Sequence, residues 1–417
     1  MEGTGDAVSV ILAPGIINNI FDGIERPLEK VAQASNGAFI TRGVSVDSLD
    51  LDKLWDTHMT VAEGDALQGG AIIAEVPETH AIVHKCMVPP DVEGIVVSVV
   101  PDGQYHINDT LVVIETTEGE RKELSMMQKW PIRVPRPVHH RYSARVPLVT
   151  GQRVMDTMFP LAKGGTAAIP GGFGTGKTMT QHQIAKWSDA DIIIYIGCGE
   201  RGNEMTQVLE EFSELVDPKS RNPLMDRTTL IANTSNMPVA AREASVYTAM
   251  TIAEYYRSMG LKVLLMADST SRWAQALREM SNRMEELPGP DAFPMDLSSI
   301  ISNFYGRAGY VKLNNGESGS ITFIGTVSPA GGNLKEPVTE NTKKVARCFY
   351  ALEQDRADKK RYPAVNPIDS YSKYIEYPEF EEYITKHING DWIGKVNEIK
   401  TRLQRGKEIA EQINILG

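Results

Sequence analysis

Cysteine is scarce in this chain, and long hydrophobic runs are missing. The 417 residues include 3 cysteines, Cys86, Cys198 and Cys348, which lie far apart and match no zinc-ligand spacing. This usage argues against a disulfide framework and favours a reducing compartment, by default the cytoplasm. Apolar runs such as residues 192–197 and 263–267 are far shorter than the roughly 18 residues that span a membrane, and the amino terminus does not read as a signal peptide. Any membrane role is therefore expected to be indirect.

Basic residues are also fewer than acidic residues. The chain has 43 Lys and Arg against 54 Asp and Glu, a formal net charge of −11. This balance opposes nonspecific attraction to nucleic acid or anionic lipid, although it leaves room for a local basic pocket. With 41% hydrophobic and 23% charged residues, the composition is that of an ordinary globular protein and excludes disorder and collagen.

Changes in composition and hydrophobic pattern along the sequence predict four segments. Residues 1–45 carry short apolar patches broken by proline and glycine, which suits a connecting segment with turns and one short helix around residues 16–24. Residues 46–130 contain short β-branched runs between Gly, Pro and Asp, which predict a small all-β insert. A proline-rich connector opens residues 131–376, and residues 377–417 begin a helical domain.

Strand-like and helix-like runs alternate through the third segment. The strand-like runs are residues 167–169, 192–196, 230–232 and 263–267, and the helix-like runs that follow them are residues 178–187, 203–215, 240–258 and 271–283. Continuously apolar strands are typical of a parallel sheet with helices on both faces, so we expect an α/β fold with a mainly parallel sheet. Residues 392–416 predict an amphipathic helix without a closing element, so the carboxyl-terminal domain is expected to be incomplete.

The β insert has two possible interpretations. Residues 64–70, followed by strands, are similar to the flattened barrel of biotinyl and lipoyl carriers, in which a tight hairpin presents a lysine. Lys85 is the only candidate, and it lacks the flanking Met-Lys-Met pattern. We therefore favour an ordinary surface lysine on a β scaffold and interpret the insert as a shape or docking element.

A complete phosphate-binding loop lies between a predicted strand and a predicted helix. It consists of Gly171, Gly172, Phe173, Gly174, Thr175, Gly176, Lys177 and Thr178, with Met179 following as a further candidate contact. The glycines let successive backbone amides converge on phosphate oxygens. Lys177 is placed to neutralise the β- and γ-phosphates, and Thr178 offers a hydroxyl to Mg²⁺. The loop predicts a nucleotide-binding domain that takes ATP or ADP with Mg²⁺.

Acidic residues end two of the predicted strands. Asp268 directly follows the apolar run 263–267. An aspartate at the end of such a strand can serve Mg²⁺ as a second group besides the Thr178 hydroxyl. Glu200 is placed at another strand end to polarise water, Arg201 to reach the γ-phosphate, and Glu204 to hold a magnesium-bound water. The alternative for these last three is a strand-to-helix capping cluster with a surface ion pair.

These motifs together resemble the catalytic A subunit of V-type and A-type rotary ATPases. The resemblance rests on residues 171–178, 197–204, 236–245 and 265–274, and it extends through residues 126–131, 327–332 and 336–339. It implies a RecA-like P-loop core, and it implies that residues 46–130 are similar to the bulge that the related F-type β subunits lack.

The resemblance further implies ATP hydrolysis or synthesis coupled to proton or sodium movement. In the family, three A subunits alternate with three B subunits, and an arginine from the B subunit completes each nucleotide site. The central shaft and peripheral stalk subunits are the other partners, and the membrane sector is reached only through them. The expected location is cytoplasmic and peripheral to the membrane, with no nucleic acid, and the isolated chain is expected to hydrolyse ATP poorly.

The resemblance also assigns roles to individual residues. The family residues that match Glu200 and Lys177 activate water and bind the γ-phosphate, and those that match Thr178 and Asp268 serve Mg²⁺. Arg272 matches an arginine near the γ-phosphate, with a helix-surface arginine as the alternative. Tyr362 matches the position of the aromatic residue that packs against adenine in the family, with a core tyrosine as the alternative. Phe173 could pack near the adenine, and the alternative is that it packs only within its own loop.

Some positions depart from the family pattern. Gly172 stands where many members have proline, and residues 365–369 are closer to the F-type pattern. The amino-terminal β-barrel and most of the carboxyl-terminal helical domain of the family have no counterpart here, which predicts a fragment of a longer chain or a short variant. A noncatalytic nucleotide-binding subunit and a hexameric nucleic-acid translocase are the competing functions. The first typically lacks the complete loop and Glu200, and the second needs a basic, aromatic nucleic-acid platform.

Overall fold

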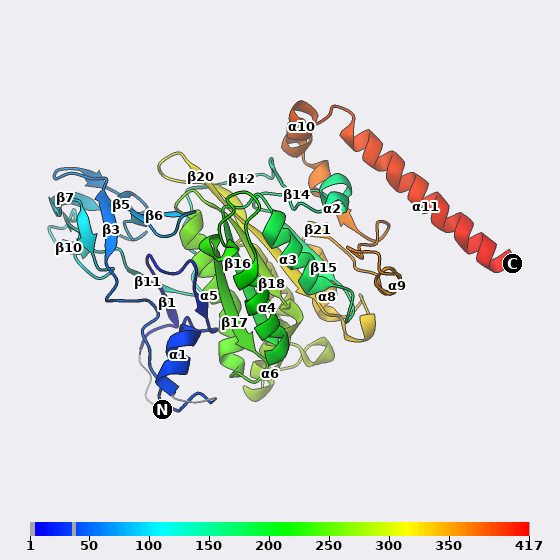
Figure 1. The fold of residues 1–417 in the computed structure, drawn as a ribbon, viewed down its shortest axis with the longest axis horizontal. Helices are drawn as coiled ribbons and strands as arrows, with labels where there is room; N and C mark the ends of the chain where they lie inside the picture. Colours follow the sequence, from blue (N-terminus) through cyan, green and yellow to red (C-terminus); the bar gives the residue numbers. More distant parts are fainter. Residues whose placement is uncertain (1–4, 36–38, 417) are drawn as a thin grey trace. The chain divides into compact units, whose positions relative to one another are not determined.

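The computed structural model describes residues 5–35 and 39–416 and divides into two compact units (Figure 1). The first unit comprises Met1–Arg141, Asp191–Ala267 and Val311–Ser320. The second comprises Tyr142–Ala190, Asp268–Tyr310 and Ile321–Gly417. Each core therefore depends on contacts between residues that are far apart in the sequence.

The first unit contains strands in the order β2-β17-β16-β18, except that Asp268, the last residue of β18, is counted with the second unit. Their bounds are Ile20–Phe21 for β2, Thr228–Thr234 for β17, Ile192–Glu200 for β16 and Lys262–Asp268 for β18. The β16–β17 and β17–β2 pairs are parallel, and every residue of β16 before Glu200 is buried. The helices that accompany these strands are α4 (Gly202–Glu214) and α5 (Val239–Arg257). The predicted α/β alternation with parallel pairing is confirmed in this unit.

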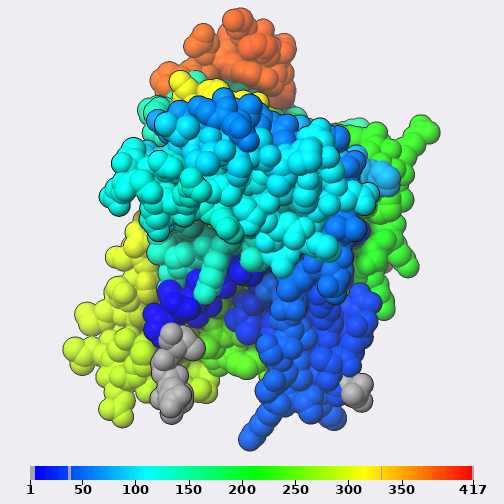
Figure 2. All heavy atoms as spheres, turned by 90° about the vertical axis from the view of Figure 1, so that its left-hand side faces the viewer, coloured from blue at the N-terminus to red at the C-terminus, as the bar shows by residue number. Residues whose placement is uncertain are grey.

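The predicted β insert also lies in the first unit, where Figure 2 shows its residues in cyan and light blue as one body. It forms two four-stranded sheets of antiparallel pairs, in the orders β10-β9-β7-β4 and β6-β5-β3-β8. The strands are β3 Trp55–Met59, β4 Ala66–Leu67, β5 Ile72–Pro77, β6 Val83–Met87, β7 Gly94–Val99, β8 Gly103–Tyr105, β9 Val112–Glu115 and β10 Arg121–Leu124. Beside them, β1 (Ser9–Leu12) pairs with β11 (Gln128–Pro131). The predicted all-β character of the insert is therefore confirmed.

The second unit contains strands in the order β20-β15-β21-β22. Strand β15 (Thr166–Pro170) runs parallel to β20 (Ser318–Val327) and to β21 (Cys348–Phe349), and β22 (Tyr371–Ser372) pairs antiparallel with β21. The helices are α2 Arg153–Met158, α3 Lys177–Trp187, α6 Thr270–Arg283, α7 Leu297–Tyr305, α8 Pro337–Val345, α9 Gln354–Asp358, α10 Pro378–His387 and α11 Trp392–Leu416. Across both units, the other elements of the described residues are β12 His140–Tyr142, β13 Pro147–Leu148, β14 Leu161–Ala162, β19 Gly309–Lys312 and the 3₁₀ helices Leu224–Arg227, Pro290–Ala292, Ala330–Gly332 and Tyr374–Glu376.

The predicted carboxyl-terminal helix is confirmed as α11, which Figure 1 shows as one long helix. The apolar stripe expected on it is buried only near its start. Val396 is 2% exposed, whereas Leu403 is 38% and Ile413 is 61% exposed. Packing within the second unit therefore covers one turn of this stripe and leaves the later positions in contact with solvent.

The short helix predicted around residues 16–24 is wrong. This stretch contains strand β2 and a turn, and the helix α1 begins later, at Leu28–Ser35. The Asp22 carboxylate accepts the backbone N–H groups of Ile24 at 3.0 Å and Arg26 at 2.8 Å. A short acidic side chain that bonds the amides just beyond it stabilises a turn in competition with a helix, and the local apolar pattern did not reveal this.

Glu25, within this turn, is a buried acid. It is 1% exposed, and its Oε2 accepts the Ile11 amide at 2.6 Å. Burial raises the pKa of Glu25 to about 8, against the lowering effect of hydrogen bonds from Ile11 and Ser48. The carboxyl group is therefore mostly protonated in the folded chain at neutral pH but ionised in the unfolded chain, which costs stability.

Replacing Glu25 by glutamine is expected to raise the free energy of unfolding, by about 2–3 kcal/mol at pH 7. Glutamine keeps the acceptor for Ile11 and carries no ionisable group. Because the folded pKa is raised, wild-type stability falls as the pH rises from 4.5 towards about 8, and the variant lacks this fall. Urea-induced unfolding at pH 5 and pH 8 measures the difference. Glu29→Gln, at an exposed position of α1, is the matched control, and the same pH dependence in Glu25→Gln and wild type contradicts the argument.

Candidate functional site

The phosphate loop lies where the sequence predicts it, between the end of β15 and the start of α3 in the second unit. Gly174 and Gly176 have φ angles of +78° and +83°, a left-handed conformation that residues with a side chain rarely adopt. Such a conformation turns backbone N–H groups towards a common point at the helix start, which is the geometry that holds an anion. The local backbone therefore fits a phosphate group.

Lys177 opens α3 and its side chain reaches back over the loop. Its Nζ donates to the carbonyl oxygens of Gly171 at 2.9 Å and Gly172 at 2.8 Å. This places the ammonium group beside the loop amides, where an incoming phosphate meets positive charge. The flanking apolar candidates, Phe173 and Met179, are 84% and 51% exposed, so both are open to a ligand.

Asp268 is brought to the loop from the end of β18. The Thr178 hydroxyl donates to Asp268 Oδ2 at 2.6 Å, and Thr326, on β20, donates to Asp268 Oδ1 at 2.7 Å. Asp268 is only 4% exposed, so its carboxylate is fixed on both oxygens within the second unit. The two residues predicted to serve a metal, 90 positions apart in the sequence, are therefore in direct contact.

This donor set fits Mg²⁺. A hydroxyl and a carboxylate are hard oxygen ligands, and Mg²⁺ is usually held by one or two such groups together with substrate phosphates and water. Among residues 5–35 and 39–416, no group of three or more His, Cys, Asp or Glu is arranged to hold a metal by itself.

The predicted adenine residue also lies at the loop. A Cβ atom built on Gly176 stands 3.3 Å from Cε1 of Tyr362, so this ring lies directly against the phosphate loop. Tyr362 is 60% exposed, which contradicts the alternative of a core tyrosine. A larger side chain at position 176 would be strained by the positive φ angle and crowded against this ring.

The remaining predicted residues lie elsewhere in the two units. Glu200 ends β16 in the first unit and is half-buried, and Arg201 and Glu204 follow it at the start of α4. The Arg201 and Glu204 side chains form an ion pair at 3.8 Å. Arg272 is half-buried in the first turn of α6 in the second unit. The catalytic roles of these four residues stay predictions.

Sequence reasoning did not single out Thr326. It lies near the end of an almost fully buried strand and is itself 0% exposed. The same strand also contains Ser318, Ser320 and Thr322, so the sequence pattern did not distinguish this hydroxyl. Lys85, in contrast, was singled out and lies within β6 rather than in a hairpin turn. Its Nζ pairs with Glu317 at 3.2 Å, as expected of an ordinary surface lysine on a β scaffold.

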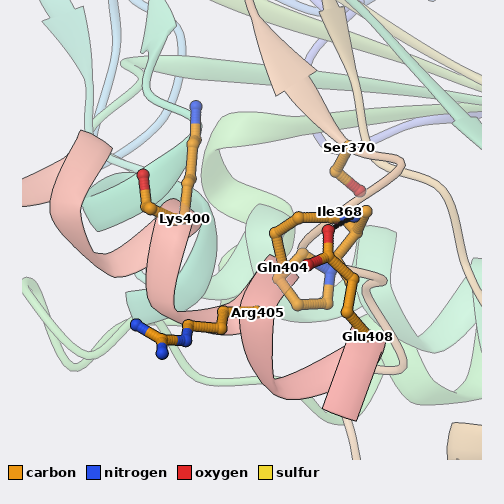
Figure 3. Close-up of a pocket in the computed structure, with 8 residues that line it drawn as sticks. Ile368, Ser370, Lys400, Gln404, Arg405 and Glu408 are labelled. Atoms are coloured by element: carbon orange, nitrogen blue, oxygen red, sulfur yellow. Dashed lines mark hydrogen bonds between the residues drawn. The ribbon is translucent and has the colours of Figure 1, made fainter. Parts of the chain in front are cut away.

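A separate pocket of about 570 Å³ lies in the second unit between α11 and the segment before β22 (Figure 3). Its lining residues are Pro367, Ile368, Ser370, Lys400, Thr401, Gln404, Arg405 and Glu408. Partial burial lowers the pKa of Lys400. None of the residues predicted from the sequence lines this pocket, so it is distinct from the phosphate-loop site.

Comparisons with known proteins show the family of this chain. The model of the ATP synthase alpha/beta family nucleotide-binding domain matches residues 151–372, and that of the ATP synthase alpha/beta subunit barrel-sandwich domain matches residues 46–133. A V-type ATP synthase alpha chain from Halothermothrix orenii is 54% identical over 99% of this chain and 70% of its own length. The A subunit of an A-type ATP synthase from Methanopyrus kandleri is 52% identical over 100% of this chain and 70% of its own length.

A solved structure gives the same fold. It is described as a prototypical ATPase from the type III secretion system of pathogenic bacteria and is 26% identical to this chain. The match has a TM-score of 0.54 and covers 67% of this chain and 82% of the other. Among residues 5–35 and 39–416, no helix has both the length and the hydropathy needed to cross a membrane.

Proposed function

The chain belongs to the ATP synthase alpha/beta family as a relative of the A subunits of A-type and V-type enzymes, and on that premise we propose that it is the catalytic nucleotide-binding subunit of a rotary ATPase or ATP synthase. It binds ATP and ADP at the phosphate loop, and its ATP hydrolysis or synthesis is coupled to the transport of protons or sodium ions by other subunits. The chain spans 70% of the length of these two relatives.

One observation carries the proposal: a complete phosphate loop whose Thr178 bonds Asp268 at 2.6 Å. Phosphoryl transfer needs a positioned acidic group beside the loop hydroxyl in addition to the loop itself. The second unit has both. A noncatalytic role is therefore less well supported than the enzyme. A nucleic-acid translocase would hydrolyse ATP with the same groups, and it is disfavoured instead by the net charge of −11.

Thr178 and Asp268 would hold Mg²⁺ together with the phosphates of the nucleotide. When bound, Mg²⁺ neutralises charge on the phosphate oxygens and orients the terminal phosphate. Lys177 binds the β- and γ-phosphates, and Phe173, Met179 and Tyr362 face the nucleotide. We assign the adenine ring to Tyr362, because an aromatic ring beside the loop offers an apolar, stackable surface.

Hydrolysis also requires a group that accepts a proton from the attacking water. We assign this role to Glu200, which stands at the carboxyl end of a parallel strand, the edge at which α/β folds bind their ligands. In this proposal Arg201 and Arg272 stabilise charge on the γ-phosphate during transfer, and Glu204 holds a water of the metal.

The proposed assembly is a ring in which this chain alternates with a B subunit that contributes an arginine to each site. The resemblance of the motifs to the catalytic subunits of this family supports this arrangement, and it supports contacts with central shaft and peripheral stalk subunits. We place the chain in the cytoplasm as part of a sector peripheral to the membrane.

The experiment that tests this function measures Mg²⁺-dependent ATP hydrolysis by the chain alone and mixed with its cognate B subunit. Hydrolysis is expected to appear or rise strongly in the mixture. Lys177→Ala is expected to bind ATP about 10- to 100-fold more weakly, because it loses charge-assisted hydrogen bonds to phosphate, and equilibrium binding of a fluorescent ATP analogue measures this.

Lys186→Ala is the matched control, since Lys186 lies in the last turn of the same helix α3. It is expected to bind and hydrolyse ATP like the wild type. Nucleotide binding without hydrolysis in the mixture supports a noncatalytic role instead. Unchanged ATP affinity in Lys177→Ala contradicts the assignment of the phosphate site.

A further inference from the structure

Asp268 has a second partner besides Thr178, and this partner belongs to neither the loop nor the strand that carries Asp268. Thr326 on β20 donates its hydroxyl to Asp268 Oδ1 at 2.7 Å. Thr326 is 0% exposed and Asp268 is 4% exposed, so the bond is shielded from water. A charge-assisted hydrogen bond in such surroundings is strong and directional.

The position of Thr326 is itself fixed by the start of α6. Its backbone carbonyl accepts the Thr270 hydroxyl at 2.9 Å, and two residues later the Ser328 amide donates to Ser271 Oγ at 2.9 Å. The close approach of strand and helix needs a glycine at position 325, because a Cβ there stands 2.8 Å from Thr270 Cγ2. The end of β20 is thus tied to the residues that directly follow Asp268.

We infer that Thr326 is a positioning residue for magnesium-nucleotide binding, which holds the Asp268 carboxylate so that Oδ2 faces Thr178 and the metal site. With Oδ1 bonded to Thr326, Oδ2 is presented to the loop, where the Thr178 hydroxyl lies 2.6 Å away. Residues that orient a metal ligand typically change metal affinity 10- to 100-fold when they are replaced. This inference rests on the proposed function, because it takes Asp268 and Thr178 as the residues that serve Mg²⁺.

The test compares ADP binding in the presence of Mg²⁺ and of EDTA, by isothermal titration calorimetry on the full chain mixed with its cognate B subunit. The gain in ADP affinity on adding Mg²⁺ reports the metal site separately from the phosphate loop. Thr326→Val keeps the shape of the side chain but removes the hydroxyl. It is expected to lose about 10-fold of the Mg²⁺-dependent gain while ADP affinity in EDTA stays unchanged, and Thr326→Ser, which restores a hydroxyl, is expected to recover the gain.

Thr322→Val is the matched control. Thr322 lies on the same strand, is 1% exposed, and its hydroxyl accepts the Gly164 amide rather than bonding to Asp268. It is expected to keep the wild-type gain. If Thr326→Val fails to fold, Thr326→Ala is measured in its place, with far-ultraviolet circular dichroism as the check on folding.

The outcomes separate this inference from the proposed function. A wild-type complex whose ADP affinity does not depend on Mg²⁺ overturns the proposed metal site, and the role of Thr326 falls with it. If Thr326→Val retains the Mg²⁺-dependent gain in ADP affinity that the wild type shows, the inference about Thr326 is overturned and the proposed metal site is not. Equal losses with Mg²⁺ and with EDTA also overturn it, because they indicate a distorted phosphate loop rather than a misplaced carboxylate.

Discussion

Replacement of Glu200 by glutamine is expected to lower ATP hydrolysis by the assembled enzyme about 10²- to 10⁴-fold, the usual contribution of a general base. Glutamine has nearly the same shape as glutamate but does not accept a proton from water. Since Glu200 lies on β16 and the phosphate loop follows β15, nucleotide binding is expected to remain. The initial rate of phosphate release and the affinity for a fluorescent ATP analogue, measured on the same complex, check both parts.

Glu210→Gln provides the control for this change. Glu210 lies on the exposed face of α4, in the helix that follows Glu200, and its replacement removes the same charge. The control is expected to hydrolyse ATP at the wild-type rate. If Glu200→Gln retains more than a tenth of the wild-type rate, Glu200 is not the general base and its role is that of a capping residue.

Replacement of Glu78 by alanine is expected to lower the free energy of unfolding by about 3–5 kcal/mol, the cost of removing one partner of a buried ion pair. The Glu78 side chain is 0% exposed and pairs with His84 Nδ1 at 2.8 Å. It also accepts the Gly15 amide at 2.8 Å and the Tyr256 hydroxyl at 2.9 Å. Alanine leaves all of these groups buried without their acceptor. Urea-induced unfolding of the wild type and the variant measures the loss.

The same network predicts a dependence on pH. Burial alone would raise the pKa of Glu78, but His84 and the donated hydrogen bonds outweigh it and bring the pKa below its ordinary value of 4.5. A folded pKa that is lowered gives stability that is present above the unfolded value and lost as the pH falls through the folded value. The difference between wild type and Glu78→Ala is therefore expected to shrink below about pH 4.5.

Lys85→Ala is the control for Glu78, because it breaks a neighbouring ion pair that is solvent-exposed. The Lys85 and Glu317 side chains are 23% and 52% exposed, and such pairs contribute about 1 kcal/mol or less. A loss for Glu78→Ala that is no larger than that for Lys85→Ala shows that the buried network does not hold the insert to α5 and the amino-terminal segment.

Local sequence pattern determined the elements of the core. The glycine spacing of residues 171–178 predicted a tightly curled loop, and the structure has positive φ angles at Gly174 and Gly176. Apolar runs predicted β16 and β18, because strands covered on both faces have few polar residues. The turn at Asp22 was missed, since a side chain that caps nearby amides competes with a helix without changing the apolar pattern.

The sequence by itself predicted which residues carry the chemistry: the phosphate loop with Lys177 and Thr178, and the acid Asp268 at the end of an apolar strand. Only the tertiary structure decided which of them touch. The Thr178–Asp268 contact joins residues 90 positions apart, and the Thr326–Asp268 bond joins residues 58 positions apart. Periodicity reports burial along one element and contains no information on which strand end meets which loop. That meeting is decided by the pairing of strands and by the packing of β20 against α6, where Gly325 admits the close approach.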